Sequence, residues 1–182
     1  IEDLEKDLSR LRLLIKKYAN KNNLEFIAAG THPFSHWKNQ IVTDNTRYHG
    51  FMDSTQYVGK RMLIFGMHVH VGIKDTDMRI DIMNQMRYFM PHILALSTSS
   101  PFWQGNITGF KSFRSIIFED LPRTGLPEQF SSYQEYQTYV RTLIKCNTID
   151  EPTKIWWDIR PHSIYPTLEF RICDCCTRMM DA

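Results

Sequence analysis

The sequence has no apolar run long enough for a membrane helix and only four cysteines in 182 residues. A membrane helix needs about 18 or more consecutive apolar residues, so we do not expect a membrane-spanning protein. Three of the cysteines lie together at residues 173–176, which does not fit the spaced disulfide framework of a secreted protein. The first five residues are mostly acidic and do not resemble a signal peptide. We therefore expect a cytoplasmic protein.

An excess of charge of one sign is also missing. The 22 basic and 20 acidic residues give a net charge of +2 and are mixed along the chain. Such a charge pattern creates no field that would hold a polyphosphate backbone, so nucleic acid is not an expected partner. The content of 42% hydrophobic and 13% aromatic residues excludes a disordered chain. The length fits one domain, residues 1–182, that folds without disulfides.

Hydrophobic periodicity predicts an amphipathic helix at the start of the chain. Leu4, Leu8, Leu11, Ile15 and Tyr18 recur at spacings of three and four. The pattern ends at the polar residues 20–23.

Two further helices are expected. Asp75 or Thr76 can cap one helix, in which Pro91 introduces a kink. Ser132, followed three residues later by Glu135, forms a capping box for another helix that ends near residue 145. The side chains expected to face the core from the kinked helix are Met78, Ile82, Met86, Phe89, Ile93 and Leu94.

The remaining segments are read as loops and strands. Residues 31–50 and 97–113 are polar and lack periodicity, which predicts long ordered loops, and such loops are often functional. Residues 62–73 are apolar and partly β-branched, as expected of a strand. Residues 155–174 predict a hairpin with its connection at residues 160–166, which hold two prolines.

Two polar pairs lie inside these apolar strands. His68 and His70 are two residues apart, so both imidazoles face one side, where they can bind a metal or simply meet solvent. Glu169 and Arg171 share a face in the same way. A carboxylate suits a hard cation and a guanidinium suits phosphate or carboxylate, whereas the alternative is an ion pair within or across strands.

Other chemical motifs are weak. Residues 108–114 combine two cations, two aromatics and a glycine, a mixture that can bind an anion. The cysteines at 173–176 lack a partner pair at zinc spacing and are expected to be buried structural thiols. Neither a Walker lysine motif nor a G-x-G-x-x-G motif after a strand is present.

Several stretches together resemble one family, the type 2 glutamate–cysteine ligases, which are bacterial carboxylate–amine ligases. The resemblance is collinear and covers residues 24 to 174. The stretches that carry it are Ala29–Phe34, Gly66–Gly72, Ala95–Trp103, Thr108–Arg114, Trp156–His162 and Thr167–Arg171.

The resemblance implies an α+β fold with a glutamine synthetase-like core, in which a curved, largely antiparallel sheet has helices packed on one face. It also implies an ATP-dependent carboxylate–amine ligase that uses Mg2+, with glutamate and cysteine as default substrates. ATP converts the carboxylate into an acyl phosphate, and the amine then displaces phosphate to form an amide bond.

The resemblance also implies roles for individual residues. Glu169 and His68 would bind magnesium, Arg171 would meet the transferred phosphoryl group, and Arg114 would bind a substrate carboxylate or phosphate. Further residues expected to line the substrate site are His70, Thr31, His32 and Arg160.

Members of this family are longer than 182 residues and open with a glutamate-rich strand that supplies further metal ligands. We therefore expect a central piece of the enzyme, truncated at both ends, whose activity in isolation is an open question. One alternative is a nucleotide- or amino-acid-binding domain of the same fold without turnover. Another is a zinc hydrolase built on His68 and His70, which would need a third ligand. The sequence also leaves open whether the protein forms a homodimer.

Overall fold

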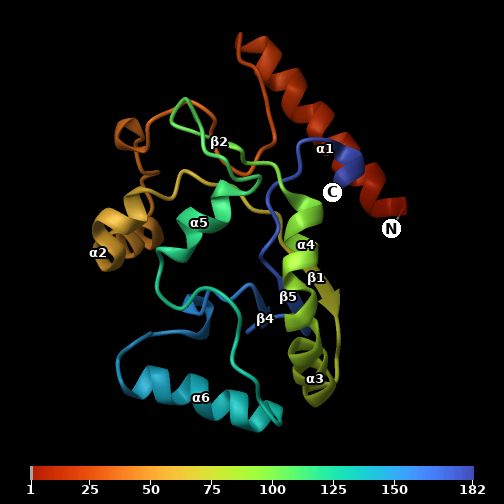
Figure 1. Ribbon diagram of the computed structural model, residues 1–182, viewed down its shortest axis with the longest axis vertical. Helices are drawn as coiled ribbons and strands as arrows, with labels where there is room; N and C mark the ends of the chain where they lie inside the picture. The colour runs from red at the N-terminus through yellow and green to blue at the C-terminus, as the bar shows by residue number, and fades with distance from the viewer. Residues whose placement is uncertain (1) are drawn as a thin grey trace.

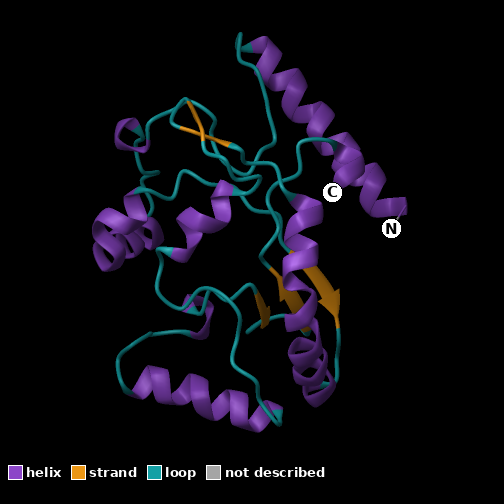
Figure 2. Cartoon of the chain, viewed as in Figure 1, coloured by secondary structure: helices purple, strands orange, loops and turns teal. Residues whose placement is uncertain are grey.

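Helices and two small antiparallel sheets make up the computed structural model, which describes residues 2–182 (Figures 1 and 2). The α-helices are α1 (Glu2–Lys21), α2 (Thr46–Lys60), α3 (Thr76–Met86), α4 (Met90–Ser97), α5 (Phe113–Glu119) and α6 (Tyr133–Lys145). The strands are β1 (Val69–Gly72), β2 (Phe102–Trp103), β3 (Asn106–Ile107), β4 (Ile159–Pro161) and β5 (Thr167–Phe170). Short 3-10 turns occupy Trp37–Asn39, Arg87–Phe89, Pro152–Lys154 and Met179–Asp181. This mixture of helices and antiparallel strands confirms the α+β class.

The main sheet has three strands in the order β1-β5-β4, with both pairs antiparallel. The predicted hairpin is therefore confirmed as β4 and β5. Arg160 was assigned to the connection, and this detail is wrong, because Arg160 lies within β4 opposite Glu169. Pairing with β5 extends β4 to Pro161, which shortens the connection.

The strand predicted over residues 62–73 is shorter than expected, since regular pairing is limited to β1. In the residues before β1, the backbone N–H groups donate hydrogen bonds to different segments of the chain. Phe65 N–H donates to the carbonyl of Gly30, while Met67 N–H donates to that of Cys173. Because its partners come from two different segments, this stretch forms isolated bridges and no continuous ladder.

The hydrophobic core lies between one face of the main sheet and the helices α3 and α6 (Figure 1). Alternation along the strands points Ile159 and Leu168 toward the helices, and both are fully buried. Each of the two helices packs an apolar face against these strands. Their buried contributions are Ile80 and Met83 from α3, and Tyr136 and Val140 from α6.

The helix predicted from residue 75 has the expected start. Asp75 is the N-cap, and its Oδ1 accepts a hydrogen bond from Met78 N–H at 2.8 Å. The predicted single kinked helix is wrong, because the chain breaks into α3 and α4 at a 3-10 turn, Arg87–Phe89. Pro91 lies in the first turn of α4, where its missing N–H leaves no helical hydrogen bond unmade.

The core-facing side of this segment was only partly predicted. Met78 and Phe89 are 56% and 47% exposed, so their assignment to the core is wrong. Ile80, Met83 and Met90 are buried in their place. A single apolar stripe cannot run along residues 78–94, because the 3-10 turn at residues 87–89 changes the rotation per residue. The expected contributions of Ile82, Met86, Ile93 and Leu94 are confirmed by their packing against the core.

The helices α1 and α6 confirm their predictions. Ser132 Oγ accepts a hydrogen bond from Glu135 N–H at 3.2 Å. The Glu135 carboxylate accepts from the N–H and hydroxyl of Ser131, and these bonds lower its pKa. α1 lies beside the C-terminal end of the chain (Figure 1), where Arg12 donates to two carbonyl groups. Across residues 2–182, none of the helices combines the length and the apolar character that crossing a bilayer would require.

The two predicted loops contain regular structure. The first one holds the 3-10 turn at Trp37–Asn39, and α2 begins at Thr46 within its last five residues, so a loop over all of residues 31–50 is wrong. Asn45 caps this helix, and Gln56, with φ of 49°, interrupts it. Periodicity missed α2 because the helix has little apolar stripe and contains two glycines. In the second loop, β2 and β3 form a hairpin through Gln104 and Gly105, whose φ values are 51° and 80°.

A buried carboxylate joins four distant parts of the chain. Asp174 is fully buried, and its Oδ2 accepts hydrogen bonds from Ser99 N–H at 2.9 Å and Ser100 Oγ at 2.7 Å. Its Oδ1 accepts from Ser112 Oγ at 2.9 Å, and this hydroxyl caps α5. A Cβ atom on Gly30 would lie 2.7 Å from Asp174 Cγ, so only glycine fits against the carboxylate. Asp174 therefore fixes where these segments meet.

We expect Asp174→Asn to lower the free energy of unfolding by about 2–4 kcal/mol. The substitution removes charged hydrogen bonds, and it also removes the negative charge nearest the buried guanidinium of Arg114. Urea unfolding measures this loss. Asp53→Asn, on the exposed surface, is the control and should leave the midpoint unchanged. An unchanged midpoint for Asp174→Asn would show that the buried network does not stabilise the fold.

Candidate functional site

Five predicted site residues lie together on the face of the sheet opposite the core. In the register of the sheet, Glu169 of β5 lies between Arg160 of β4 and His70 of β1. Arg171 and His68 continue this face one alternation further along, just beyond the ends of β5 and β1. The structure thus brings together residues up to 103 positions apart in the chain.

Glu169 is the centre of this cluster, and its side chain is only 3% exposed. Its Oε2 accepts a hydrogen bond from Arg160 Nε at 2.7 Å, and its Oε1 accepts one from Arg171 Nη1 at 2.7 Å. His68 Nδ1 lies 3.1 Å from the same Oε1. Burial raises the pKa of Glu169, but the hydrogen bonds and the arginine charges hold it well below its usual range. The carboxylate is therefore ionised at neutral pH.

The two arginines are nearly as buried as the carboxylate they contact. Arg160 Nη1 also donates to the carbonyls of Thr153 and Ile155. The Nε of Arg171 is buried and has no hydrogen-bond partner within residues 2–182. Burial and the charge of Arg160 lower the pKa of Arg171. Two guanidinium groups against one carboxylate leave one positive charge in excess, which favours an anionic ligand.

The histidines form the more open edge of the cluster. The side chains of His68 and His70 are 38% and 35% exposed. His70 Nδ1 lies 3.0 Å from Thr167 Oγ1, and its Nε2 lies 3.9 Å from Glu169 Oε1. Both rings are therefore accessible to a ligand that approaches Glu169.

His162 also belongs to this edge, and the sequence analysis did not select it. Its ring packs edge-on against His70, with 5.3 Å between ring centroids. The Nδ1 atom accepts hydrogen bonds from the N–H groups of Ile164 and Tyr165, and burial lowers the pKa of His162. The ring is thus neutral with its proton on Nε2. Strand alternation from Arg160 was the signal that could have identified it.

Asp158 is a second residue that sequence reasoning missed. Its carbonyl accepts the N–H of Arg171 at 2.7 Å, so it lies directly beside the cluster. Burial, with the nearby charge of Glu119, raises the pKa of Asp158 to about 6, although Arg114 and Arg171 act in the opposite direction. A carboxyl group that titrates this close to neutrality is common near functional sites.

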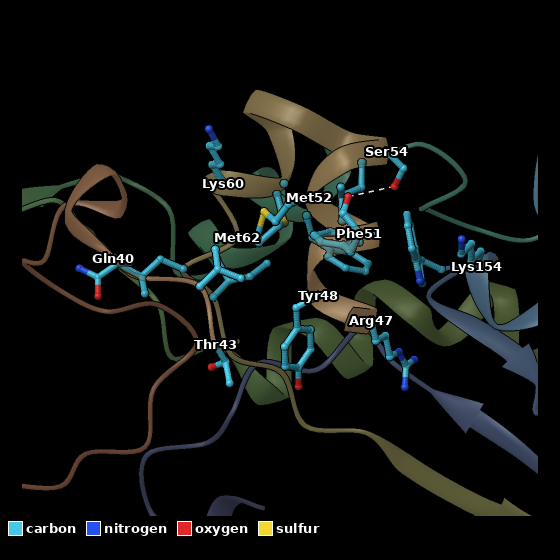
Figure 3. A pocket seen from close by; sticks show the side chains of 18 of the residues that line it. Gln40, Thr43, Arg47, Tyr48, Phe51, Met52, Ser54, Lys60, Met62 and Lys154 are labelled. Atoms are coloured by element: carbon cyan, nitrogen blue, oxygen red, sulfur yellow. Dashed lines mark hydrogen bonds between the residues drawn. The ribbon is translucent and has the colours of Figure 1, made fainter. Parts of the chain in front are cut away.

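An open pocket of about 1360 Å3 adjoins the cluster, and Arg171 is part of its lining. Figure 3 shows side chains of α2, of residues 40–43 and of the segment around Lys154 surrounding this space. Basic side chains outnumber acidic ones in the lining. The basic residues are Lys38, Arg47, Lys60, Lys154 and Arg171, and the acidic ones are Asp150 and Glu151.

Aromatic rings form much of the pocket wall. Phe51 packs edge-on against Trp156 at 5.6 Å, and the Arg123 guanidinium lies 5.2 Å from the Trp156 ring. Trp37 and Tyr57 form a second edge-on pair at 5.1 Å. Flat apolar walls beside basic groups suit a ligand with an aromatic ring and a phosphate. The pocket was missed because α2, which forms much of it, was not predicted.

Thr31 and His32 lie elsewhere and make no hydrogen bond to the Glu169 cluster. Thr31 is buried, and its hydroxyl donates to the carbonyl of Phe102 at 2.7 Å. It lines a second pocket of about 540 Å3, together with Leu96 and Phe102. His32 Nδ1 accepts a hydrogen bond from Ser35 N–H at 3.1 Å.

Arg114 is connected to the cluster through the backbone. It is buried, and its guanidinium donates to the carbonyls of Arg171 and Ile172 at 3.0 and 2.9 Å.

Glu169 is the residue best suited to hold a metal. Among residues 2–182, no three His, Cys, Asp or Glu side chains converge as a metal-binding group. The third ligand that the zinc alternative needs is therefore not found in this part of the protein. Mg2+ is commonly held by one or two carboxylates together with phosphate oxygens and water. The Glu169 carboxylate, which is ionised at neutral pH, thus fits one ligand position of a magnesium–nucleotide complex.

Comparisons with known proteins bear on this site. The family model described as "Glutamate-cysteine ligase family 2(GCS2)" matches residues 1–182. A protein of Herpetosiphon aurantiacus, provisionally named glutamate–cysteine ligase 2, is 50% identical over all 182 residues, which cover 47% of its own length. Proteins with the same provisional name from Roseiflexus castenholzii and Rhodospirillum rubrum are 52% and 51% identical over 98% and 96% of this chain, and the matches cover 47% and 45% of their own lengths.

The chain spans about half the length of the curated relatives it matches. The match nevertheless extends over the whole chain and includes every residue of the Glu169 cluster. The family resemblance inferred from the motifs is confirmed, and the chain belongs to glutamate-cysteine ligase family 2.

Proposed function

We propose that residues 1–182 form part of the catalytic core of an ATP-dependent carboxylate–amine ligase that joins glutamate to cysteine. We include in this proposal the glutamine synthetase-like fold, in which an antiparallel sheet presents its polar face to the reactants. One observation carries the proposal: a buried, ionised carboxylate and two buried guanidinium groups converge next to a basic, aromatic-lined pocket. Cytoplasm is the proposed location, because ATP, glutamate and reduced cysteine occur there together.

The chemistry explains why such a group of residues is needed. When bound, magnesium-ATP supplies the phosphoryl group that activates the substrate carboxylate as an acyl phosphate, and an amine then replaces phosphate. Negative charge from the triphosphate and from the attacking carboxylate must be brought to one place. The protein must neutralise this charge with groups that are already oriented before the reaction begins.

Arg171 is proposed to bind the transferred phosphoryl group. Its side chain reaches the pocket, and its Nε is a buried donor without a partner in the described part of the chain. A guanidinium presents two N–H groups in a fixed fork that matches phosphoryl oxygens. Arg160 contacts Glu169 from the other side and sets the orientation of the carboxylate.

Glu169 is proposed to bind magnesium through Oε1, with His68 beside it. Oε1 faces the open edge of the cluster, where His68 Nδ1 lies 3.1 Å away. The Nε2 of His68 makes no hydrogen bond within residues 2–182 and is free for a ligand. His70 is proposed to line the substrate side of the site, and the aromatic walls formed by Phe51 and Trp156 are proposed to hold the nucleotide base.

Replacing Glu169 by Gln should abolish magnesium-dependent nucleotide binding, because a neutral amide cannot replace the charge that a hard cation requires. Isothermal calorimetry with magnesium-ATP on a full-length ligase containing this chain measures the effect. Glu169→Asp keeps the charge and should weaken binding without abolishing it, while Glu25→Gln on the exposed surface should change nothing. Unchanged magnesium-ATP affinity in Glu169→Gln, with a normal circular dichroism spectrum, would defeat the metal assignment.

Replacing Arg171 by Lys should lower kcat by about ten- to a thousandfold, the range typical for loss of one oriented donor in a transition state. The KM for ATP should change little, because the lost interaction belongs to the transition state. Steady-state kinetics of phosphate release provide the measurement. The control is Arg141→Lys, at an exposed position of α6. A normal turnover number would remove Arg171 from the mechanism.

The 182 residues alone should release no phosphate when mixed with ATP, magnesium, glutamate and cysteine. The described residues supply one carboxylate, Glu169, that is suited to bind a metal, whereas phosphoryl transfer to a carboxylate needs more negative ligands for its metal ions. The comparison is a phosphate-release assay against the full-length protein. Equal turnover would show that the metal ligands have been misplaced. Nucleotide binding without turnover in the full-length protein would instead support the binding-domain alternative.

A further inference from the structure

Arg114 is a buried cation whose hydrogen bonds go to the backbone and not to a carboxylate. The residue is only 3% exposed and lies in the first turn of α5. Its Nη2 donates to the carbonyl of Arg171 at 3.0 Å, and its Nη1 donates to the carbonyl of Ile172 at 2.9 Å. The two ends of the guanidinium fork thus hold two consecutive carbonyl groups. Arg114 is not among the residues that line the pocket next to Arg171.

Several groups fix Arg114 itself. Its backbone N–H donates to Ser100 Oγ at 3.0 Å, and this hydroxyl donates in turn to Asp174. Burial lowers the pKa of Arg114, whereas the charge of Asp174 opposes this effect and keeps the cation favourable. A Cβ on Gly66 would lie 2.5 Å from Arg114 Nη2, so a glycine is needed where the guanidinium passes the chain. Arg114 therefore has one well-defined position.

This position determines the backbone at Arg171. The N–H of Arg171 donates to the carbonyl of Asp158 at 2.7 Å, and its carbonyl accepts from Arg114. Strand β5 ends at Phe170, so Arg171 lies just beyond the last paired residue of the sheet. Without Arg114, one side of the Arg171 peptide would lose its hydrogen bond. A side chain whose backbone shifts by about 1 Å can lose a hundredfold in rate when it must meet a reacting group.

We propose that Arg114 is a positioning residue for the ligase reaction, which acts by holding the carbonyls of Arg171 and Ile172 so that the Arg171 guanidinium keeps its direction. This inference rests on the proposed role of Arg171. It differs from the role implied by the family resemblance, in which Arg114 would touch a substrate carboxylate or phosphate. A lysine cannot reproduce the effect, because one ammonium group lacks the planar fork that spans two carbonyls.

A double-mutant cycle tests the proposal in a full-length ligase that contains this chain. Arg114→Lys should lower kcat about tenfold or more, while the KM values for ATP and glutamate stay unchanged. In the Arg171→Lys background, the same substitution should have little further effect, because the guanidinium that Arg114 positions is no longer present. Equal fold-losses in both backgrounds would overturn the proposal, since they would show that Arg114 acts independently of Arg171. A raised KM with unchanged kcat would overturn it in favour of direct substrate contact.

Arg79 offers a matched control. It is also a buried arginine, 5% exposed, whose Nε and Nη2 donate to the carbonyl of Ile73 at 3.1 and 2.7 Å. It belongs to α3 and has no contact with Arg171 among the hydrogen bonds of residues 2–182. Arg79→Lys should give the same fold-change in kcat whether position 171 is Arg or Lys. This control separates a general loss of stability from a specific loss of position.

Hydrogen exchange provides a measurement that does not depend on activity. The amide of Arg171 should exchange faster in Arg114→Lys than in the wild type and in Arg79→Lys, because its peptide is less restrained. Unchanged exchange would overturn the proposal even if the wild type ligates normally. A wild type that does not ligate, but shows this exchange pattern, would refute the proposed function and leave the positioning contact intact.

A second variant covers the case in which Arg114→Lys does not fold. Gly66→Ala keeps Arg114 but places a methyl group against its guanidinium. It should reproduce the lower kcat and the faster exchange of the Arg171 amide. Normal values for both in Gly66→Ala would contradict the proposal.

Discussion

The buried charge of Glu169 is the constraint on which this face of the sheet depends. An isolated carboxylate costs a great deal of free energy when it is removed from water, and it is tolerated only when other groups satisfy both oxygens. Arg160 and Arg171 satisfy one oxygen each, at 2.7 Å. Because one arginine comes from β4 and the other follows β5, the carboxylate also fixes how these two segments lie beside each other. The register of the hairpin and the geometry of the site therefore have one physical origin.

A second buried carboxylate, Asp174, holds the segments next to this cluster through hydrogen bonds. Asp174 orients three serines, one of which positions the backbone of Arg114, and Arg114 returns to the carbonyls of Arg171 and Ile172. Residues 171 to 174 thus connect both buried carboxylates through a few peptide units. Neither the Arg171 nor the Arg114 guanidinium can move without leaving a buried carbonyl or carboxylate unpaired, so we expect a change at one carboxylate to affect the other.

The sequence predicted those features that depend on local patterns. Alternation alone placed His68 with His70 and Glu169 with Arg171, and the structure shows all four on one face. Arg160 was assigned to the hairpin connection, because only its pairing with β5 shows that the strand extends so far. The pocket wall formed by α2 was missed for a different reason: its aromatic residues pack against distant segments, so they leave no local stripe.

Both oxygens of Glu169 already accept hydrogen bonds from arginines, and this limits how a ligand can bind. A metal ion that approaches Glu169 must compete with at least one arginine for an oxygen, and a phosphate that approaches Arg171 must compete with Glu169 for the guanidinium. Either ligand alone would leave a buried charge without its partner, at a large cost in free energy. Under the proposed function, a metal–phosphate complex meets both needs at once, because the carboxylate turns to the metal while the guanidinium turns to the phosphate. The ion pairs between Glu169 and the arginines thus favour ligands that carry both charges together.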